Sequence, residues 1–599
     1  MAWRGSRQTP RLVSRIRATE GVWVATGSEI ASHVESLGAS LPVSGADLAH
    51  RGGSVTAASH APTPVVLHGG RTFTADRQRR WAQAVAFDPS GLLAVGTDDE
   101  ILARFPDARP IDVGGRTVVP GFIDAHNHFL ATGESLSSID VRYPAVASCE
   151  ALVDAIAGAA ETTPEGSWIR AFGFDHAKYD MVPTRWDLDR ATTRHPVLVY
   201  HVSGHHVLAN SETLKRRGLR DDTPDPPGGE LVRDPSGRLT GLCLEAAMNV
   251  VLPVVVDIGR HGPNFHTEAS LEELVDAVDR AGKAFLEAGL TTVCDAQVTR
   301  RELAAYRAAA NAGRLRLRTV CMPLSHQLDE YLSLGLAGPF GDDLLRLGAM
   351  KFYADGSLIG GTAPFEEPYG ERGELRGSLY WAPDELREMI VAAHVGGWQI
   401  GVHAQGDRAI GSVLDAIEAA VQTRPREHRH RLEHAGYPTP AQIRRVAGLG
   451  VITINQPRFL HDSGDEFLVR LGERAHRLQP LRDELDAGVR VVLSSDSDVA
   501  SYRPLDVIAS AIARRTRNGK SIGEDHALTL EEALFAYTID AAFALRLEDR
   551  LGSLEPGKRA DLVVIDGDLE ATPTHEIASV GIWKTFLDGR IAHQADQWP

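Results

Sequence analysis

Short apolar runs alternate with longer amphipathic stretches through the middle of the chain. Short runs are typical of buried strands, and apolar residues repeated with a helical period are typical of helices packed on a core. The expected strands are residues 117–124, 168–174, 291–296, 347–353, 399–404, 429–433, 451–455 and 489–494. The expected helices include residues 271–288, 383–395, 409–423 and 440–448. This alternation predicts an α/β protein, a (β/α)8 TIM-like barrel.

The alternation is interrupted at about residues 175–268, which predicts a large insertion after barrel strand 2. We therefore expect the barrel to occupy residues 119–549. A doubly wound sheet is the competing architecture, but no Gly-rich dinucleotide-binding fingerprint follows an early strand.

The two flanks of the barrel segment are rich in short strands and turns. Residues 62–118 and residues 550–599 are expected to pair into one small β-sandwich domain, with a final hairpin around Asp588 and Gly589. Residues 1–61 are rich in Ser, Ala, Gly and Arg and lack periodicity, so we predict a disordered extension there.

Composition and charge exclude several classes of partner but say little about the fold. The 599 residues carry a net charge of −17, which disfavours binding to nucleic acid or to an anionic membrane. Four cysteines without a CxxC pair indicate a reducing, cytoplasmic location. No apolar run approaches the ~18 residues that span a bilayer. The expected partner is a small-molecule substrate, with a homodimer left open as the assembly.

Polar residues at the carboxyl ends of the expected strands carry the chemistry, because barrel active sites are assembled there. His126 and His128 follow the first strand, and their spacing places both imidazoles on one side of an extended segment. Two neutral imidazoles are good ligands for Zn²⁺. The pair alone is weak evidence, because the chain has 24 histidines.

Three further strand ends strengthen the prediction of a metal site. His403, His434 and Asp496 each follow an apolar run. Any one of them alone is equally well explained as a hydrogen-bonded residue that closes a strand. Four strand ends with metal-type ligands in one barrel are much harder to attribute to chance.

Lys351 lies inside an apolar strand, where a cation is costly to bury. Carbamylation by CO₂ would convert its amine into an anionic ligand able to bridge two metals. The alternatives are a pair with a carboxylate such as Asp355 and a side chain that reaches solvent.

The order His-x-His, Lys, His, His, Asp resembles that of the amidohydrolase superfamily. The surrounding segments resemble its amidohydrolase-3, or YtcJ-like, branch, which includes the N-substituted formamide deformylases. The resemblance covers the chain from about residue 62 onward. The matching segments are residues 65–70, 119–128, 228–230, 237–241, 351–357, 403–410, 431–435, 456–457, 495–497 and 552–561.

The resemblance implies one or two divalent metal ions, zinc being expected. His126, His128 and Asp496 would hold one ion and His403 and His434 a second, with carbamylated Lys351 between them. A metal-activated hydroxide would attack a non-peptide amide of a small molecule. Asp496 would carry the proton from the water to the leaving nitrogen.

The predicted insertion adds a catalytic candidate. By resemblance His205 donates to the substrate carbonyl, although a buried histidine that holds the insertion together is an equal alternative. Its neighbours His201 and Ser203 depart from the residues usual in relatives, which puts the usual substrates in doubt. Asp498 stands where relatives often have Pro, and the added carboxylate favours an amine-bearing substrate.

Five residues complete the predicted site, and a sixth is expected to point away from it. Substrate contacts are expected from His201, Asp498, Asp175 after strand 2 and Asp295 after strand 3. Asp407 is expected either to support His403 or to cap a helix. Glu433 is expected to point away from the His434 side.

The leading function is thus a hydrolase of carbon–nitrogen bonds other than peptide bonds. Deamination and ester or lactone hydrolysis on the same metal barrel remain alternatives, although the Glu-bearing helix motif of the deaminases is not recognised. A non-catalytic binding protein is a third alternative, but such a descendant should have lost ligands.

Overall fold

The computed structural model describes residues 62–78, 80–175 and 178–595. The predicted extension at residues 1–61 lies outside the described residues. In the part of the chain that is described, no helix is both long and apolar enough to cross a membrane.

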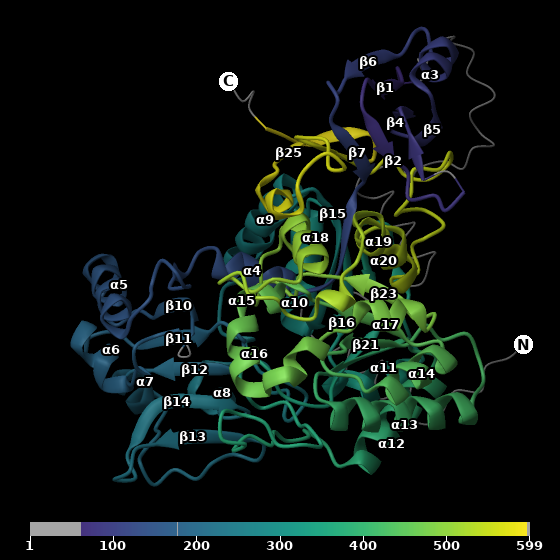
Figure 1. Cartoon of the computed structure of the whole chain (residues 1–599). Coiled ribbons are helices and arrows are strands. Elements are labelled where there is room, and N and C mark those ends of the chain that lie inside the picture. Colours follow the sequence, from purple (N-terminus) through teal and green to yellow (C-terminus); the bar gives the residue numbers. More distant parts are fainter. Residues whose placement is uncertain (1–61, 79, 176–177, 596–599) are drawn as a thin grey trace, which may run out of the picture. The chain divides into compact units, whose positions relative to one another are not determined.

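Eight parallel strands alternate with helices in the order of a TIM-like α/β barrel (Figure 1). They are β8 (Phe122–Asn127), β15 (Leu290–Val298), β16 (Arg318–Pro323), β19 (Met350–Tyr353), β20 (Ile400–Ala404), β21 (Arg431–His434), β22 (Ile452–Asn455) and β23 (Arg490–Leu493). β8, β15 and β16 pair in one sheet, which β18 (Leu345–Leu347) and β17 (Phe340–Gly341) extend. β19 to β23 pair in order in a second sheet.

Main-chain contacts connect these two sheets at both junctions. A parallel bridge joins Leu324, just after β16, to Lys351 on β19. At the other junction, the Asp496 amide donates to the His126 carbonyl at 2.9 Å, and the His128 amide donates to the Ser497 carbonyl. The ends of the first and last barrel strands therefore lie side by side.

Amphipathic helices cover the strands. The helices are α4 (Phe129–Ser135), α9 (Leu271–Glu287), α10 (Arg300–Asn311), α12 (Pro383–Val395), α13 (Asp407–Thr423), α14 (Pro440–Leu449), α17 (Leu481–Asp486), α18 (Pro504–Ala513), α19 (Leu530–Ala536) and α20 (Ile539–Ala544). α9 illustrates their origin: Ser270 and Glu273 form a capping box at its start. Its apolar face, including Val278 and Phe285, is buried in the main core.

The insertion forms a separate six-stranded sheet covered by α5 (Cys149–Thr162), α6 (Arg185–Ala191) and α7 (Ser211–Arg216) (Figure 1). Its strands are β9 (Ile139–Asp140), β10 (Ile169–Phe174), β11 (Val197–His201), β12 (His206–Ala209), β14 (Leu239–Glu245) and β13 (Gly229–Arg233). The prediction of an insertion after barrel strand 2 is wrong, because β8 pairs directly with β15 and β10 lies in the inserted sheet. The insertion follows barrel strand 1 and contains residues well before 175.

Both flanks of the barrel segment contribute strands to one common sheet. β24 (Leu562–Ile565) pairs with β7 (Thr117–Pro120) on one side and with β25 (Ile582–Leu587) on the other. β26 (Arg590–Gln594), β2 (Arg71–Phe73) and β3 (Trp81–Ala82) complete this sheet. A second sheet holds β1 (Val65–His68), β4 (Ala84–Asp88), β5 (Gly91–Gly96) and β6 (Arg109–Asp112). Apolar residues of both sheets share one buried cluster, which includes Leu67, Phe87, Leu562 and Phe586.

Candidate metal centre

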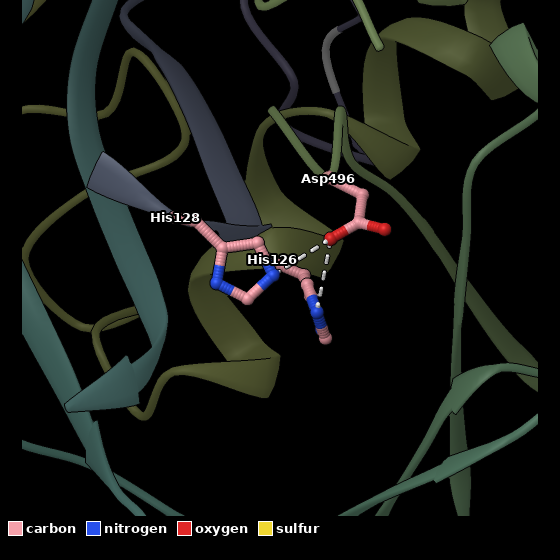
Figure 2. Close-up of side chains that lie close together, drawn as sticks. All are labelled: His126, His128 and Asp496. Carbon is pink, nitrogen blue, oxygen red and sulfur yellow. Dashed lines mark ion pairs between the residues drawn. The ribbon is translucent and has the colours of Figure 1, made fainter. Parts of the chain in front are cut away.

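Three side chains meet where β8 and β23 end. Asp496 Oδ1 lies 3.2 Å from His128 Nε2 and 3.4 Å from His126 Nε2. Figure 2 shows the Asp496 carboxylate facing both imidazoles. One ligand atom from each residue lies within 4.8 Å of the others, and all three side chains are buried. We call His126, His128 and Asp496 the first ligand group.

The other predicted ligands adjoin this group. Lys351 Nζ lies 3.4 Å from His126 Nε2, and the His434 ring lies 4.9 Å from the His126 ring. The His403 and His434 rings are 4.4 Å apart. We call His403 and His434 the second ligand group. The six residues thus form one contiguous buried cluster at the carboxyl ends of five barrel strands.

In three of the histidines, one ring nitrogen contacts an oxygen atom, and this contact shows which of the two nitrogens carries the proton. His126 Nδ1 contacts Glu433 Oε2 at 2.5 Å, His434 Nδ1 contacts Gln456 Oε1 at 2.8 Å and His403 Nε2 contacts the Gly356 carbonyl at 3.1 Å. Each partner oxygen is an acceptor, so the ring nitrogen that faces it carries the proton. The opposite nitrogen keeps its lone pair, as a metal ligand must.

A carboxylate oxygen of Asp496 lacks a hydrogen-bond partner, which is consistent with a cation-binding site. Within the described ranges, buried Asp496 Oδ1 accepts no hydrogen bond, although it lies close to two imidazole nitrogens. An ionised carboxylate oxygen is costly to bury without a partner. The donor set of imidazoles and a carboxylate suits Zn²⁺ or a similar divalent ion. The residues present therefore fit a metal.

Backbone strain marks two of the ligands. His434 has φ 72° and Asp496 has φ 54°, in the left-handed region that non-glycine residues rarely adopt. Each such residue costs about 1–3 kcal/mol and is held in place only by its surroundings. Strain of this kind gathers at functional sites, and here both residues belong to the cluster.

The electrostatics favour a neutral imidazole at three of the four histidines and an ionised carboxylate. Burial alone would lower the pKa of His128, but its contact with Asp496 raises that pKa overall. Burial and the nearby charge of Lys351 hold the pKa of His126 well below its usual value. Burial does the same for the pKa of His403 and of His434. Burial alone would raise the pKa of Asp496, but its contact with His128 and the charges around it lower that pKa overall. Burial lowers the pKa of Lys351 to about 8.

The cluster opens into a cavity of about 490 Å³. His128, His403, His434 and Asp496 line it from the barrel side, and residues of the insertion line it from the other. His205 is among the latter, with its ring 5.7 Å from the His403 ring. Its Nδ1 lies 2.8 Å from Glu245 Oε2, which leaves Nε2 for a ligand.

Comparison with known proteins identifies the family to which this chain belongs. Residues 109–593 match the amidohydrolase family. This chain belongs to the amidohydrolase family. The prediction from the motifs is therefore confirmed.

Individual relatives place this amidohydrolase in the YtcJ-like branch. It is 33% identical to the N-substituted formamide deformylase of Arthrobacter pascens, over 87% of this chain and 96% of the relative. It is 28% identical to the putative amidohydrolase YtcJ of Bacillus subtilis, over 88% of this chain and 99% of the relative. A solved structure of an uncharacterized metal-dependent hydrolase from Pyrococcus horikoshii matches with a TM-score of 0.68 and 25% identity, over 86% of this chain and 99% of that one.

The amidohydrolase does not bring every predicted site residue to the cavity. Asp498 lines it. His201 is fully buried beside Asp175, with 3.8 Å between His201 Nε2 and Asp175 Oδ1, and neither lines the cavity. Asp175 lies elsewhere than expected because β10 is a strand of the insertion. Asp295 lies on β15, where its carboxylate accepts from the Tyr306 hydroxyl.

Asp407 does not cap α13 with its side chain, because Gly406 is the N-cap residue. Asp407 Oδ1 accepts from the Glu366 amide at 2.9 Å. The carboxylate that approaches His403 is Asp355, whose Oδ1 lies 3.4 Å from His403 Nε2. Asp355 also accepts from the amides of Gln405 and Gly406. It is thus paired with the start of α13 and not with Lys351.

Two carboxylates that support the site were not predicted from the sequence. Glu433 contacts His126 and accepts from the guanidinium of Arg431 at 2.7 and 2.8 Å. Glu245 accepts from Thr362 at 2.6 Å and from the Tyr380 hydroxyl, in addition to its contact with His205. The available signal was burial of a charge: each glutamate lies within or at the end of an apolar strand, where it needs a partner.

Proposed function

We propose that this amidohydrolase is a metal-dependent hydrolase that cleaves the carbon–nitrogen bond of a small, non-peptide amide. The observation that carries the proposal is the first ligand group, in which an orphaned carboxylate oxygen faces two imidazoles beside a cavity. The Arthrobacter pascens relative is an N-substituted formamide deformylase, so N-substituted formamides are the first amides to test.

Two ions, with zinc preferred, would be held by the first and second ligand groups. A divalent ion there acts as a Lewis acid and lowers the pKa of water. Lys351 would join the two groups as a carbamate: its neutral amine forms a bond to the carbon of CO₂ and releases a proton. Its buried position against His126 Nε2 supports this assignment, because a bare ammonium is costly there.

The chain's own groups divide the work of proton transfer and substrate orientation. Asp496 takes a proton from the attacking water and delivers it to the leaving nitrogen, because its carboxylate lines the cavity beside the two imidazoles. His205 donates from Nε2 to the substrate carbonyl when both of its ring nitrogens carry a proton, and the Glu245 carboxylate accepts the proton on Nδ1. Tyr380 and Thr362 fix Glu245 in turn.

Metal analysis and a turnover screen test the proposal together. Protein purified without chelator is analysed for divalent ions and assayed against formamides, other N-acyl amines, cyclic imides and lactones. We expect at least one ion per chain and hydrolysis of an amide. Less than one ion per chain, with no activity restored by Zn²⁺, Mn²⁺ or Co²⁺, contradicts the metal site. Turnover of lactones alone contradicts the amide assignment.

A further inference from the structure

Six carboxylates line the cavity, and they differ in what neutralises them. Glu134 is paired with Arg301 at 2.5 Å and Asp276 with Arg314 at 2.8 Å. Glu273 accepts from the Ser270 amide, and Asp496 faces the imidazoles. Two carboxylates remain, Glu268 and Asp498, for which no cationic side chain of the described residues lies within ion-pair distance.

These two carboxylates lie in different surroundings. Glu268 is exposed, so water solvates its charge. Asp498 is partly buried, two positions after Asp496 in the same cavity wall. A carboxylate withdrawn from water without a cation is unfavourable unless a ligand supplies one. Asp498 is therefore the carboxylate of the lining that a cationic ligand would neutralise.

The rest of the lining suits the body of such a ligand. Phe172, Tyr200, Phe265 and Val499 line the same cavity and offer aromatic and apolar surface. Aromatic faces also attract ammonium groups. The two arginines of the lining donate to main-chain carbonyls, Arg170 to Glu268 and Arg280 to Gly133. The overall charge of −17 adds a long-range attraction for cations.

We propose that Asp498 is a specificity residue that binds a protonated amino group of the substrate. The substrate class is then an amide that carries a second, basic nitrogen, such as a mono-acylated diamine. This inference rests on the proposed function, because it assumes that the cleaved amide lies at the ligand groups.

The test uses three formamides of similar length that differ only at the far end. Monoformyl diaminobutane ends in an ammonium, N-pentylformamide in a methyl group and N-formylaminobutyrate in a carboxylate. We expect the wild-type enzyme to prefer the ammonium compound over the methyl compound by about tenfold to a hundredfold in kcat/KM. The carboxylate compound should be the poorest of the three.

Two variants locate the preference. In Asp498→Asn the ratio of ammonium to methyl compound should fall to about one, through a higher KM for the ammonium compound. Glu268→Gln removes the same charge from the same cavity lining at an exposed position and should keep the wild-type ratio. A wild-type ratio in Asp498→Asn, equal losses on both compounds, or the same change in Glu268→Gln would overturn the inference.

The same measurements distinguish a failure of the proposed function from a failure of the inference about Asp498. Hydrolysis of all three compounds without an ammonium preference leaves an amide hydrolase and removes the substrate class. If none is hydrolysed, formamide hydrolysis fails, and calorimetric titration of the same compounds into the metal-loaded wild type and Asp498→Asn decides the inference. Tighter binding of the ammonium compound that is lost in the variant supports it, and equal binding overturns it.

Discussion

The two ligand groups of the proposed metal centre differ in the groups that lie behind their imidazoles. Behind the first group, His126 contacts the carboxylate of Glu433, which is itself fixed by buried Arg431. Behind the second, His434 contacts a neutral amide oxygen and His403 contacts a main-chain carbonyl, with the Asp355 carboxyl 3.4 Å from the same nitrogen of His403. Burial holds the pKa of the Asp355 carboxyl well above its usual value, which favours its neutral form. A carboxylate behind an imidazole makes it a more basic ligand than a neutral oxygen does. The first group should therefore hold its metal more tightly.

The largest effect is expected when the first group loses its carboxylate. Asp496→Asn removes both a ligand charge and the proton carrier, so kcat/KM should fall by roughly a thousandfold. Metal analysis should show about one ion fewer per chain than in the wild type. Asp525→Asn, an exposed position, is the matched control. A fully active Asp496→Asn enzyme would remove Asp496 from the mechanism.

A somewhat smaller loss is expected at the residue between the groups. Lys351→Ala should lose metal from the second group first and reduce kcat by roughly a hundredfold. Acetate or propionate should restore part of the activity, because a free carboxylate can occupy the place of the carbamate. As a control, the same acid should raise the activity of the variant and leave the activity of the wild type unchanged. Retention of both ions without added acid would argue for a plain amine.

Sequence patterns selected six residues that the structure brings into one cluster, because each is a polar residue within or directly after an apolar strand. The same rule gave a wrong prediction at β10. Its apolar run followed by Asp175 has the pattern of a barrel strand, although β10 belongs to the insertion. β16 was missed because it ends in Met322 and Pro323 and carries no ligand. Pairing between distant strands decides which runs join one sheet, and no local pattern encodes it.

Glu433 shows a second limit of local patterns. Strand alternation correctly separates it from the side chain of His434, which suggested a role remote from the metal. The partner of Glu433 is instead His126, 307 positions earlier in the chain. His434 also departs from ordinary strand geometry, with its φ of 72°. Contacts across a barrel and strained backbone are both properties of the folded chain, so neither could be predicted from one strand.

Substitutions of the residues behind the imidazoles test whether the two ligand groups differ in metal affinity. Glu433→Gln should weaken metal binding by about tenfold to a hundredfold. Gln456→Leu, which removes the neutral support of His434, should weaken it less. Competition with a chelator, followed by metal analysis, measures both. Because Arg431 loses its buried partner in Glu433→Gln, thermal unfolding of the metal-loaded variants must accompany the comparison. Equal weakening by the two substitutions would contradict unequal support.

The smallest effect is expected away from the ligands. Glu245→Gln should lower kcat about tenfold while metal content stays at the wild-type level, because the ion-pair partner of Glu245 is His205 and not a ligand residue. The pH dependence of kcat should change, since the partner of the imidazole loses its charge. Thr362→Val keeps the Glu245 carboxylate and should have a weaker effect. An unchanged pH profile in Glu245→Gln would assign Glu245 a purely structural role.

The pairing of β24 with β7 has a consequence for biosynthesis. β7 ends at Pro120, just before β8, which carries His126 and leads directly into His128, yet β24 begins only at Leu562. During translation β7 keeps an open edge until more than four hundred further residues have left the ribosome. The first ligands to be synthesised are thus among the last to gain their complete support. Metal loading should therefore follow release of the finished chain, and a ribosome-bound fragment that stops before β24 should retain little metal.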